Sequence, residues 1–200
     1  MSLARFQFLR RLALALLLAL AFAGLFFVQS AWNEQVHDLI EAVGLGLIVI
    51  GIVGRVWCTL YIGGRKSSEI VDVGPYSMSR NPLYFFSSVA AAGVGAQSGS
   101  ITLALAFFVG CALAFLIVMR REEAFLAAQF GAPYAAYLAQ TPRFLPKLSL
   151  FRDQAELLVR TDRIYATLMD GAVFFVAKPM LELIEHVQRQ GFIPIFLNLY

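Results

Sequence analysis

The sequence has few charged residues, and this shortage excludes an ordinary water-soluble domain. Only 14% of its 200 residues are charged, whereas about a quarter is usual for a soluble protein. With 60% hydrophobic residues and a mean hydropathy of +0.72, the chain has too little polar surface to cover a globule in water. Lipid must cover much of it, so the sequence predicts an integral membrane protein.

Cysteine and histidine are equally scarce, with two of each. Cys58 and Cys111 lie inside apolar runs, where a thiol behaves as a small hydrophobic side chain, and no disulfide framework is implied. His37 and His186 have no partners at the spacing of metal ligands, so we interpret both as surface or interfacial residues and predict no metal. The basic residues lie at the ends of apolar runs and are not interleaved with aromatic residues, which excludes nucleic acid as the expected partner.

What the sequence does contain is a series of apolar runs. The first, Leu12–Val28, follows three arginines and resembles a signal peptide with a cleavage site at Ala21-Phe-Ala23, but apolar residues continue past that site. We therefore predict a retained helix with a cytoplasmic N-terminus. The loop 29–41 carries acidic residues and no Lys or Arg, which predicts a non-cytoplasmic position. The run Ala42–Ile62 is the second expected span.

Arg55 lies within this second run, on the same helical face as Gly44 and Gly51. The two glycines permit a close helix approach, so we expect Arg55 to point into the bundle and not into lipid. An arginine inside a membrane is expensive, and a functional role is the default hypothesis. Because Arg55 is near the cytoplasmic end of the run, snorkelling to the inner headgroups is an equal alternative.

A polar segment over residues 63–80, predicted to be cytoplasmic, leads into an apolar hairpin. The first arm, Pro82 to about Ala96, has 15 residues, and at 1.5 Å per residue it reaches about 22 Å, short of a hydrocarbon core of roughly 30 Å. Either this arm stops within the bundle or the Gln97–Ser100 turn dips into the membrane. The second arm, Ile101–Met119, has 19 residues and is long enough to span.

Beyond the hairpin, Arg120 to about Ala139 is predicted to be an amphipathic cytoplasmic helix, and basic residues keep the following segment inside. The last apolar stretch, Ile164 to about Ile184, is either a fifth span or a helix lying in the interface. Its Lys178 and Glu182 are four residues apart and can pair.

The predicted fold is an all-α polytopic membrane helical bundle of four to five transmembrane helices with a cytoplasmic amphipathic helix. We divide the chain into N-terminal transmembrane helices (1–62), a core with the hairpin (63–147) and a C-terminal linker with the last membrane or interfacial helix (148–200). The sequence gives no indication of the oligomeric state.

Polar residues suited to binding a ligand gather at one end of the hairpin. We call the two chain segments there its feet: residues 80–82 before the first arm and residues 122–123 after the second. Asn81 is a favoured N-cap and Pro82 a favoured first helical residue, so a helix begins there. The free N–H groups at the start of this helix, with Arg80 beside them, form a binding site for an anion. Glu122 and Glu123 follow the second arm, and a closed hairpin brings them near. A carboxylate accepts hydrogen bonds from ribose hydroxyls or pairs with an ammonium, so the two sites together match an amino-acid–nucleoside cofactor.

The motifs in this region are Gly74-Pro-Tyr-x-x-x-Arg-Asn-Pro-x-Tyr84, Glu122-Glu-x-x-Leu126, Phe130-Gly-x-x-Tyr134-x-x-Tyr137 and Pro142-Arg-Phe-Leu-Pro146. In order and spacing, over about residues 60 to 147, the chain resembles the membrane methyltransferases, which include isoprenylcysteine carboxyl methyltransferases and phosphatidylethanolamine N-methyltransferases. The resemblance implies an S-adenosylmethionine pocket formed by Arg80, Asn81, Pro82, Tyr84, Glu122 and Glu123, with Tyr76, Tyr137 and Arg143 near the cofactor or the substrate entrance.

The implied function is methyl transfer from S-adenosylmethionine to a lipid-like or lipidated acceptor at the cytoplasmic face of a bacterial inner membrane. Arg55 or Arg143 would seat an anionic group of the acceptor. Many prenylcysteine-type members carry histidine where this chain has Asn81, so the carboxylate of a prenylated cysteine, the amine of a phospholipid and a small thiol all stay open as acceptors. The alternative is a non-catalytic transporter or scaffold that retains the fold. A transporter would place charges near the midplane of several spans, whereas this chain concentrates them at the feet of one hairpin.

Overall fold

Helices dominate the structure, a computed structural model that describes residues 25–65, 68–192 and 194–200. The elements in chain order are β1 (Val28–Ser30), α2 (Glu34–Ile62), α3 (Pro75–Met78), α4 (Pro82–Ala96), α5 (Ile101–Phe130), α6 (Ala132–Gln140), η1 (Leu148–Leu150), α7 (Thr161–Ala172), η2 (Val173–Val176), α8 (Ala177–Arg189) and β2 (Leu197–Leu199). Three helical stretches, 34–62, 101–130 and 161–189, are long and apolar enough to cross a membrane, and α4 is a shorter apolar helix. The predicted all-α membrane bundle is confirmed.

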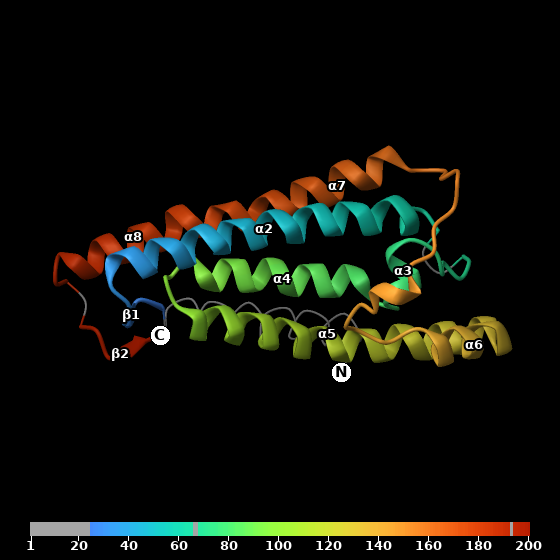
Figure 1. Cartoon of the computed structure of the whole chain (residues 1–200), viewed down its shortest axis with the longest axis horizontal. Helices are drawn as coiled ribbons and strands as arrows, with labels where there is room; N and C mark the ends of the chain where they lie inside the picture. The colour runs from blue at the N-terminus through green and yellow to red at the C-terminus, as the bar shows by residue number, and fades with distance from the viewer. Residues whose placement is uncertain (1–24, 66–67, 193) are drawn as a thin grey trace, which may run out of the picture.

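Helix α4 is the centre of the bundle. It packs against both α2 and α5, while α7 and α8 follow α2 (Figure 1). The strands lie at one end of the bundle, and α3 and α6 lie at the other. Among the described helices α5 packs mainly against α4, and its apolar residues Leu105, Leu113 and Ile117 are about 60% exposed. An apolar surface of this extent needs lipid to cover it.

Glycines on α2 explain why α4 lies so close to it. A β-carbon added to Gly44 would lie 2.7 Å from the Cβ of Ala96, and one added to Gly51 would lie 2.6 Å from the Cβ of Ala90. Carbon atoms do not approach so closely, so the contact requires glycine. The predicted close approach at this helix face is confirmed, and it is the type of small-residue packing that joins helices in membranes.

Helix α2 begins earlier than predicted. The acidic segment expected to be a loop up to Glu41 is helical from Glu34 onward. Asn33 caps this helix, since its side chain accepts a hydrogen bond from the backbone N–H of Val36 at 3.0 Å. Acidic residues in a first turn also suit the positive end of the helix dipole. The predicted boundary at Ala42 is therefore wrong.

The hairpin has the predicted first arm, and its second arm also begins as predicted, at Ile101. The predicted break at Met119 is wrong, because α5 continues without interruption to Phe130. The residues after Met119 are mostly good helix formers, so nothing stops the helix there. It ends at Gly131, whose φ is +59°. The separate helix α6 begins after this residue. The predicted cytoplasmic helix is thus the end of α5 followed by α6.

The C-terminal helical stretch lies along α2. The hydroxyl groups of Thr59 and Thr167 are 2.9 Å apart and join α2 to α7. The predicted pair in α8 is confirmed, since Lys178 Nζ is 3.3 Å from Glu182 Oε1. With 29 residues from Thr161 to Arg189, this stretch qualifies as a span by length and composition, which is the first of the two alternatives.

Two three-residue strands are the β-structure of the described residues. Strands β1 and β2 pair in parallel, with Val28 opposite Leu197. Their pairing brings the C-terminal end of the chain to the turn between α4 and α5, where Ser100 Oγ donates to the carbonyl of Tyr200 at 3.0 Å. The helix predicted over Leu12–Val28 lies outside the described residues up to position 24, and Val28 itself belongs to β1.

Candidate functional site

The foot of the hairpin is built from two chain segments that hydrogen-bond to each other. Their backbone bonds join Gly74 N to Arg152 O (2.7 Å), Arg80 N to Pro142 O (2.9 Å) and Lys147 N to Met78 O (3.0 Å). In addition, the Ser79 hydroxyl donates to the carbonyl of Phe144 at 3.0 Å. The segments 74–81 and 142–152 therefore form one unit that carries the start of α4.

Gly74 allows this unit to close. Its φ is +57°, and a β-carbon at this position would overlap the ring of Tyr61. Only glycine satisfies both conditions. The Tyr61 hydroxyl in turn donates to Asp153 Oδ1 at 2.6 Å, and this hydrogen bond lowers the pKa of the Asp153 carboxyl. The end of α2 is thus joined to the linker before α7.

Glu123 is the centre of the polar network in this unit. Its side chain is about 10% exposed and lies 2.9 Å from Arg143 Nη2 and 3.4 Å from Arg80 Nη1. Arg143 Nε also donates to both carboxylate oxygens, at 3.0 and 3.2 Å. One carboxylate therefore balances two guanidinium groups from different segments and fixes α5 against them. The predicted meeting of the two hairpin feet is confirmed.

The side chain of Asn81 differs from its predicted role. Helix α4 does begin at Pro82, but the Asn81 side chain makes no capping hydrogen bond. Its amide instead donates to Glu123 Oε1 at 3.3 Å and to the carbonyl of Arg143 at 3.0 Å. The charged carboxylate fixes the Nδ2 end of the amide, and in this orientation Oδ1 accepts no hydrogen bond from the first turn of α4. Asn81 does occupy the predicted position before the first helical residue, and its side chain belongs to the Glu123 network.

A cavity of about 120 Å³ lies beside this network. Seven of the eight residues predicted to bind a cofactor line it, namely Tyr76, Arg80, Asn81, Tyr84, Glu122, Glu123 and Tyr137. The eighth, Pro82, is buried as the first residue of α4. Arg143 and Arg55 are not part of the lining. Tyr134 also lines the cavity, and its place in the Phe130-to-Tyr137 motif was the signal for it.

The tyrosines of this cavity are neutral hydrogen-bonding groups at physiological pH. Burial raises the pKa of Tyr134 to about 12 and also raises the pKa values of Tyr76 and Tyr137. The Tyr137 hydroxyl donates to the carbonyl of Tyr76 at 2.7 Å and ties α6 to α3. None of the three phenols is suited to remove a proton from a substrate.

Arg55 points into the bundle, towards α4, as the first of the two alternatives expects. Its Nη1 donates to the hydroxyl of Ser87 on α4 at 2.6 Å, and Ser87 donates onward to the carbonyl of Leu83 at 2.8 Å. Its Nε is buried and has no hydrogen-bond partner among the described residues. Arg55 therefore presents an unsatisfied donor inside the bundle, outside the cavity at the hairpin foot.

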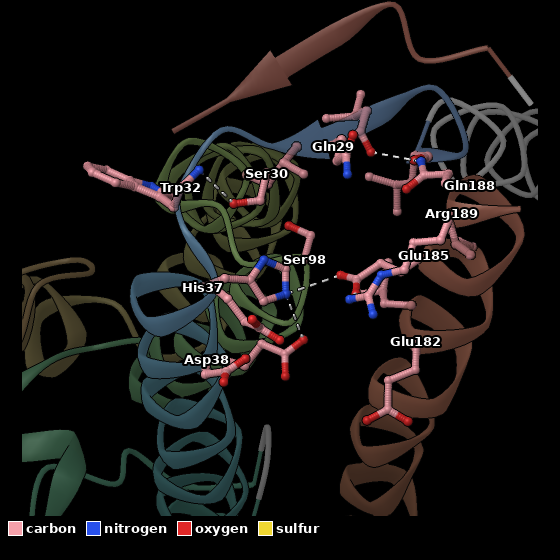
Figure 2. Close-up of a pocket in the computed structure, with 17 residues that line it drawn as sticks. Gln29, Ser30, Trp32, His37, Asp38, Ser98, Glu182, Glu185, Gln188 and Arg189 are labelled. Atoms are coloured by element: carbon pink, nitrogen blue, oxygen red, sulfur yellow. Dashed lines mark hydrogen bonds and ion pairs between the residues drawn. The ribbon is translucent and has the colours of Figure 1, made fainter. Parts of the chain in front are cut away.

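A larger cavity, of about 390 Å³, lies at the opposite end of the bundle (Figure 2). It contains His37, which is 3.3 Å from both Glu41 and Glu185. The prediction that His37 lacks such partners is wrong: Glu41, four residues along the same helix, was a detectable signal, whereas Glu185 is brought in by the fold. His186 is exposed and contacts Gln190, as expected of a surface residue.

Comparisons with known proteins find a family match over the part of the chain that contains most of the residues lining the smaller cavity. The family model described as phospholipid methyltransferase matches residues 39–133, a range that includes α4 and most of α5. No solved structure matches the chain.

Two curated relatives are similar over most of their length. The nickel-cobalt-cadmium resistance protein NccN of Alcaligenes xylosoxydans xylosoxydans is 36% identical over 171 residues, which are 85% of this chain and 80% of the relative. The cobalt-zinc-cadmium resistance protein CzcN of Cupriavidus metallidurans is 34% identical over 161 residues, which are 80% of this chain and 74% of the relative. With the hairpin, its two charged feet and these matches together, the chain belongs to the phospholipid methyltransferase family.

Proposed function

We propose that this membrane protein transfers a methyl group from S-adenosylmethionine and binds that cofactor in the cavity at the hairpin foot. The observation that carries the proposal is the lining of one cavity by a guanidinium, three carboxylates and four tyrosines, which come from α3, α4, α5, α6 and the segments before α3 and α4. The cavity has a volume of about 120 Å³, so it would hold part of this cofactor, and the remainder would lie outside it.

The donors and acceptors of this cavity suit an amino-acid–nucleoside ligand. Arg80 Nε is buried and has no hydrogen-bond partner among the described residues, so it is a donor available to a carboxylate. Glu122 lines the same cavity and is the acceptor for ribose hydroxyls or an ammonium group. Glu123 holds Arg80 and Asn81 in place and so acts as a positioning residue.

The cofactor supplies an electrophilic methyl group on a positively charged sulfur. The chain has to hold the acceptor in line with that group, and alignment alone can contribute roughly 7–11 kcal/mol to lowering a barrier. A carboxylate acceptor needs no base, whereas an amine must first lose a proton. Because the cavity tyrosines stay protonated, a carboxylate of the lining is the group suited to accept it.

The acceptor of the proposed reaction is a lipid-like or lipidated molecule that enters from the bilayer, at the cytoplasmic face. Arg143, whose side chain is 41% exposed, lies at the edge of the site and is placed to attract an anionic headgroup. The relatives are named for resistance to divalent metals, and we carry this over as the proposed setting, a membrane of cells exposed to such ions.

Incubating membranes with methyl-labelled cofactor should place label in the lipid extract or in precipitated protein. Cofactor binding without label in any fraction would favour the non-catalytic alternative.

Glu122→Gln is the direct test of the cofactor site. Glutamine keeps the size of the side chain but loses the charge, and a hydrogen bond to a charged group contributes about 1.5–3 kcal/mol. We expect S-adenosylmethionine to bind at least tenfold more weakly, as measured by calorimetry on the purified protein in detergent. Glu156→Gln, an exposed residue of the linker, is the matched control. Equal affinities in the two variants would contradict the assignment of Glu122.

Arg55→Ala tests the proposed seat for the acceptor. Arg55 does not line the cofactor cavity, so the affinity for S-adenosylmethionine should stay unchanged. If the unsatisfied Nε binds an anionic group of the acceptor, kcat/KM for that acceptor should fall by about tenfold or more. A variant with normal kcat/KM would show that Arg55 serves only to join α2 to α4.

A further inference from the structure

The larger cavity lies between the first turns of α2 and the last turns of α8, far from the hairpin foot (Figures 1 and 2). Most of its ionisable side chains are acidic: Glu34, Asp38, Glu41, Glu182 and Glu185, against His37 and Arg189. A concave surface lined by one sign of charge concentrates ions of the opposite sign. This end of the molecule is therefore prepared for a cation.

Three of these side chains converge. His37 Nε2 is 3.3 Å from Oε1 of Glu41 and 3.3 Å from Oε1 of Glu185, and the three atoms lie within 4.8 Å of one another. Two ligand atoms on one tetrahedral ion, each about 2.0–2.2 Å from it, are about 3.3–3.6 Å apart. A single imidazole N–H can donate well to only one of two carboxylates, whereas a divalent cation satisfies all three groups.

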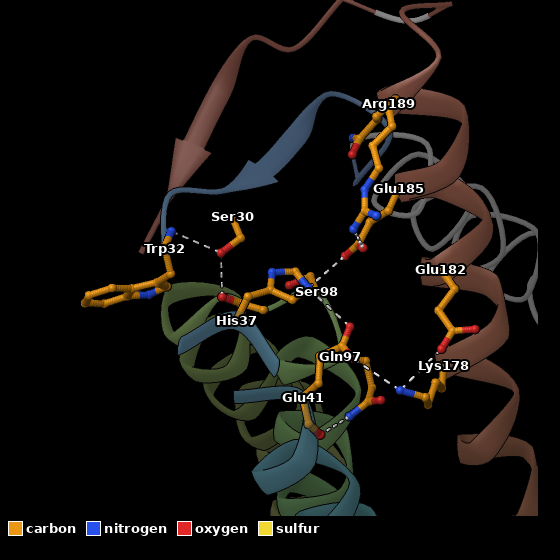
Figure 3. Close-up of polar contacts among 12 residues, drawn as sticks. Ser30, Trp32, His37, Glu41, Gln97, Ser98, Lys178, Glu182, Glu185 and Arg189 are labelled. Atoms are coloured by element: carbon orange, nitrogen blue, oxygen red, sulfur yellow. Dashed lines mark hydrogen bonds and ion pairs between the residues drawn. The ribbon is translucent and has the colours of Figure 1, made fainter. Parts of the chain in front are cut away.

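The other oxygens of the two carboxylates are held from outside. Lys178 Nζ is 3.2 Å from Oε2 of Glu41, and Arg189 Nη2 is 3.5 Å from Oε2 of Glu185. Each carboxylate thus directs Oε1 towards His37 while a cationic side chain fixes Oε2 (Figure 3). Outer partners of this kind orient the ligands in metal sites.

A buried amide gives an independent indication of a ligand. Gln97 is 1% exposed and donates from Nε2 to the carbonyl of Glu41 at 2.8 Å, but its Oε1 has no hydrogen-bond partner among the described residues. Figure 3 shows this amide directed towards the space where Glu41 meets Lys178. Gly99 makes room on the other side, because a β-carbon there would overlap the imidazole of His37. This buried acceptor next to Glu41 has no donor among the described residues, and a solvent molecule of the site would supply one.

We propose that His37, Glu41 and Glu185 bind a divalent transition-metal ion, with solvent completing its coordination. One imidazole and two carboxylates without sulfur suit Zn²⁺ and Co²⁺. The site joins α2 to α8 and is separate from the proposed methyltransferase site, so it does not depend on that function. Because the ligands meet only in the folded protein, a bound ion stabilises the native state.

The test uses the full-length protein in detergent, purified without a polyhistidine tag and freed of metal by chelation. Titration with Co²⁺, followed by visible absorption, should show one equivalent bound per chain and displaced by Zn²⁺. His37→Ala and Glu185→Gln should each weaken Co²⁺ binding at least tenfold. His186→Ala, which removes an exposed histidine of α8, is the matched control and should bind as the unchanged protein does.

Thermal unfolding with and without Zn²⁺ separates loss of the site from loss of the fold. Zn²⁺ should raise the Tm of the unchanged protein, of His186→Ala and of Glu122→Gln, and should not raise the Tm of His37→Ala. Equal Co²⁺ affinities in His37→Ala and His186→Ala, or no stoichiometric binding at all, would overturn the proposal. In that case the cluster is an ion-paired contact between the two helices.

Discussion

Replacing Glu123 by glutamine is expected to abolish measurable cofactor binding and to destabilise the foot of the hairpin. The carboxylate is buried between Arg80 and Arg143, at 3.4 and 2.9 Å, and glutamine cannot balance either charge. Leaving a buried charge without its partner costs about 3–5 kcal/mol, and the partial exposure of Arg143 puts the expected loss at the lower end. Asn81 also loses its charged acceptor, so the cavity wall and the anion-binding site change together.

The two effects of Glu123→Gln are measured separately. Chemical or thermal unfolding of the purified protein should show the loss of stability, and calorimetry should show the loss of S-adenosylmethionine binding. The contrast with Glu122→Gln is decisive, since that variant should lose affinity with a smaller loss of stability than Glu123→Gln, because Glu123 is the carboxylate that balances the two arginines. A Glu123→Gln protein of normal stability and affinity would mean that the network does not support the site.

Gly51→Leu should prevent the folded bundle from forming in useful amounts. Even a single added carbon at Gly51 would lie 2.6 Å from the Cβ of Ala90 and 2.8 Å from the backbone of Phe86. Overpacking of a tight contact costs about 1–3 kcal/mol and sometimes more, and leucine adds three further carbon atoms. We expect a loss above about 3 kcal/mol, visible as a fall in the yield of folded protein from membranes.

Gly46→Leu is the control for this experiment. Gly46 lies on the same helix, but a β-carbon there has nothing within 4 Å. The same substitution therefore changes hydrophobicity and helix propensity equally without disturbing α4. Yield and Tm should be at least those of the unchanged protein, because leucine is the better helix former. A similar loss in both variants would mean that the close contact of α2 and α4 is not what limits folding.

Apolar runs and helix signals allowed much of the hairpin to be predicted from the sequence. Its first arm is bounded by the pair Asn81-Pro82 and by the Gln97–Ser100 turn, and the helix ends lie there because proline and the polar turn act locally. The end of the second arm could not be predicted from hydrophobicity. Arg120 ends an apolar run but not a helix, since arginine and glutamate are good helix formers and the backbone continues to Gly131.

The sequence by itself determined that the protein lies in a membrane and which residues stand at the two feet of one hairpin. Lipid solvation depends on composition and run length, and the motifs are local, so both are visible along the chain. Only the tertiary structure decided the partners. Glu123 pairs with two arginines and accepts a hydrogen bond from the Asn81 amide. His37 lies next to Glu185, which is far from it in the sequence. Such pairs depend on which helices pack together.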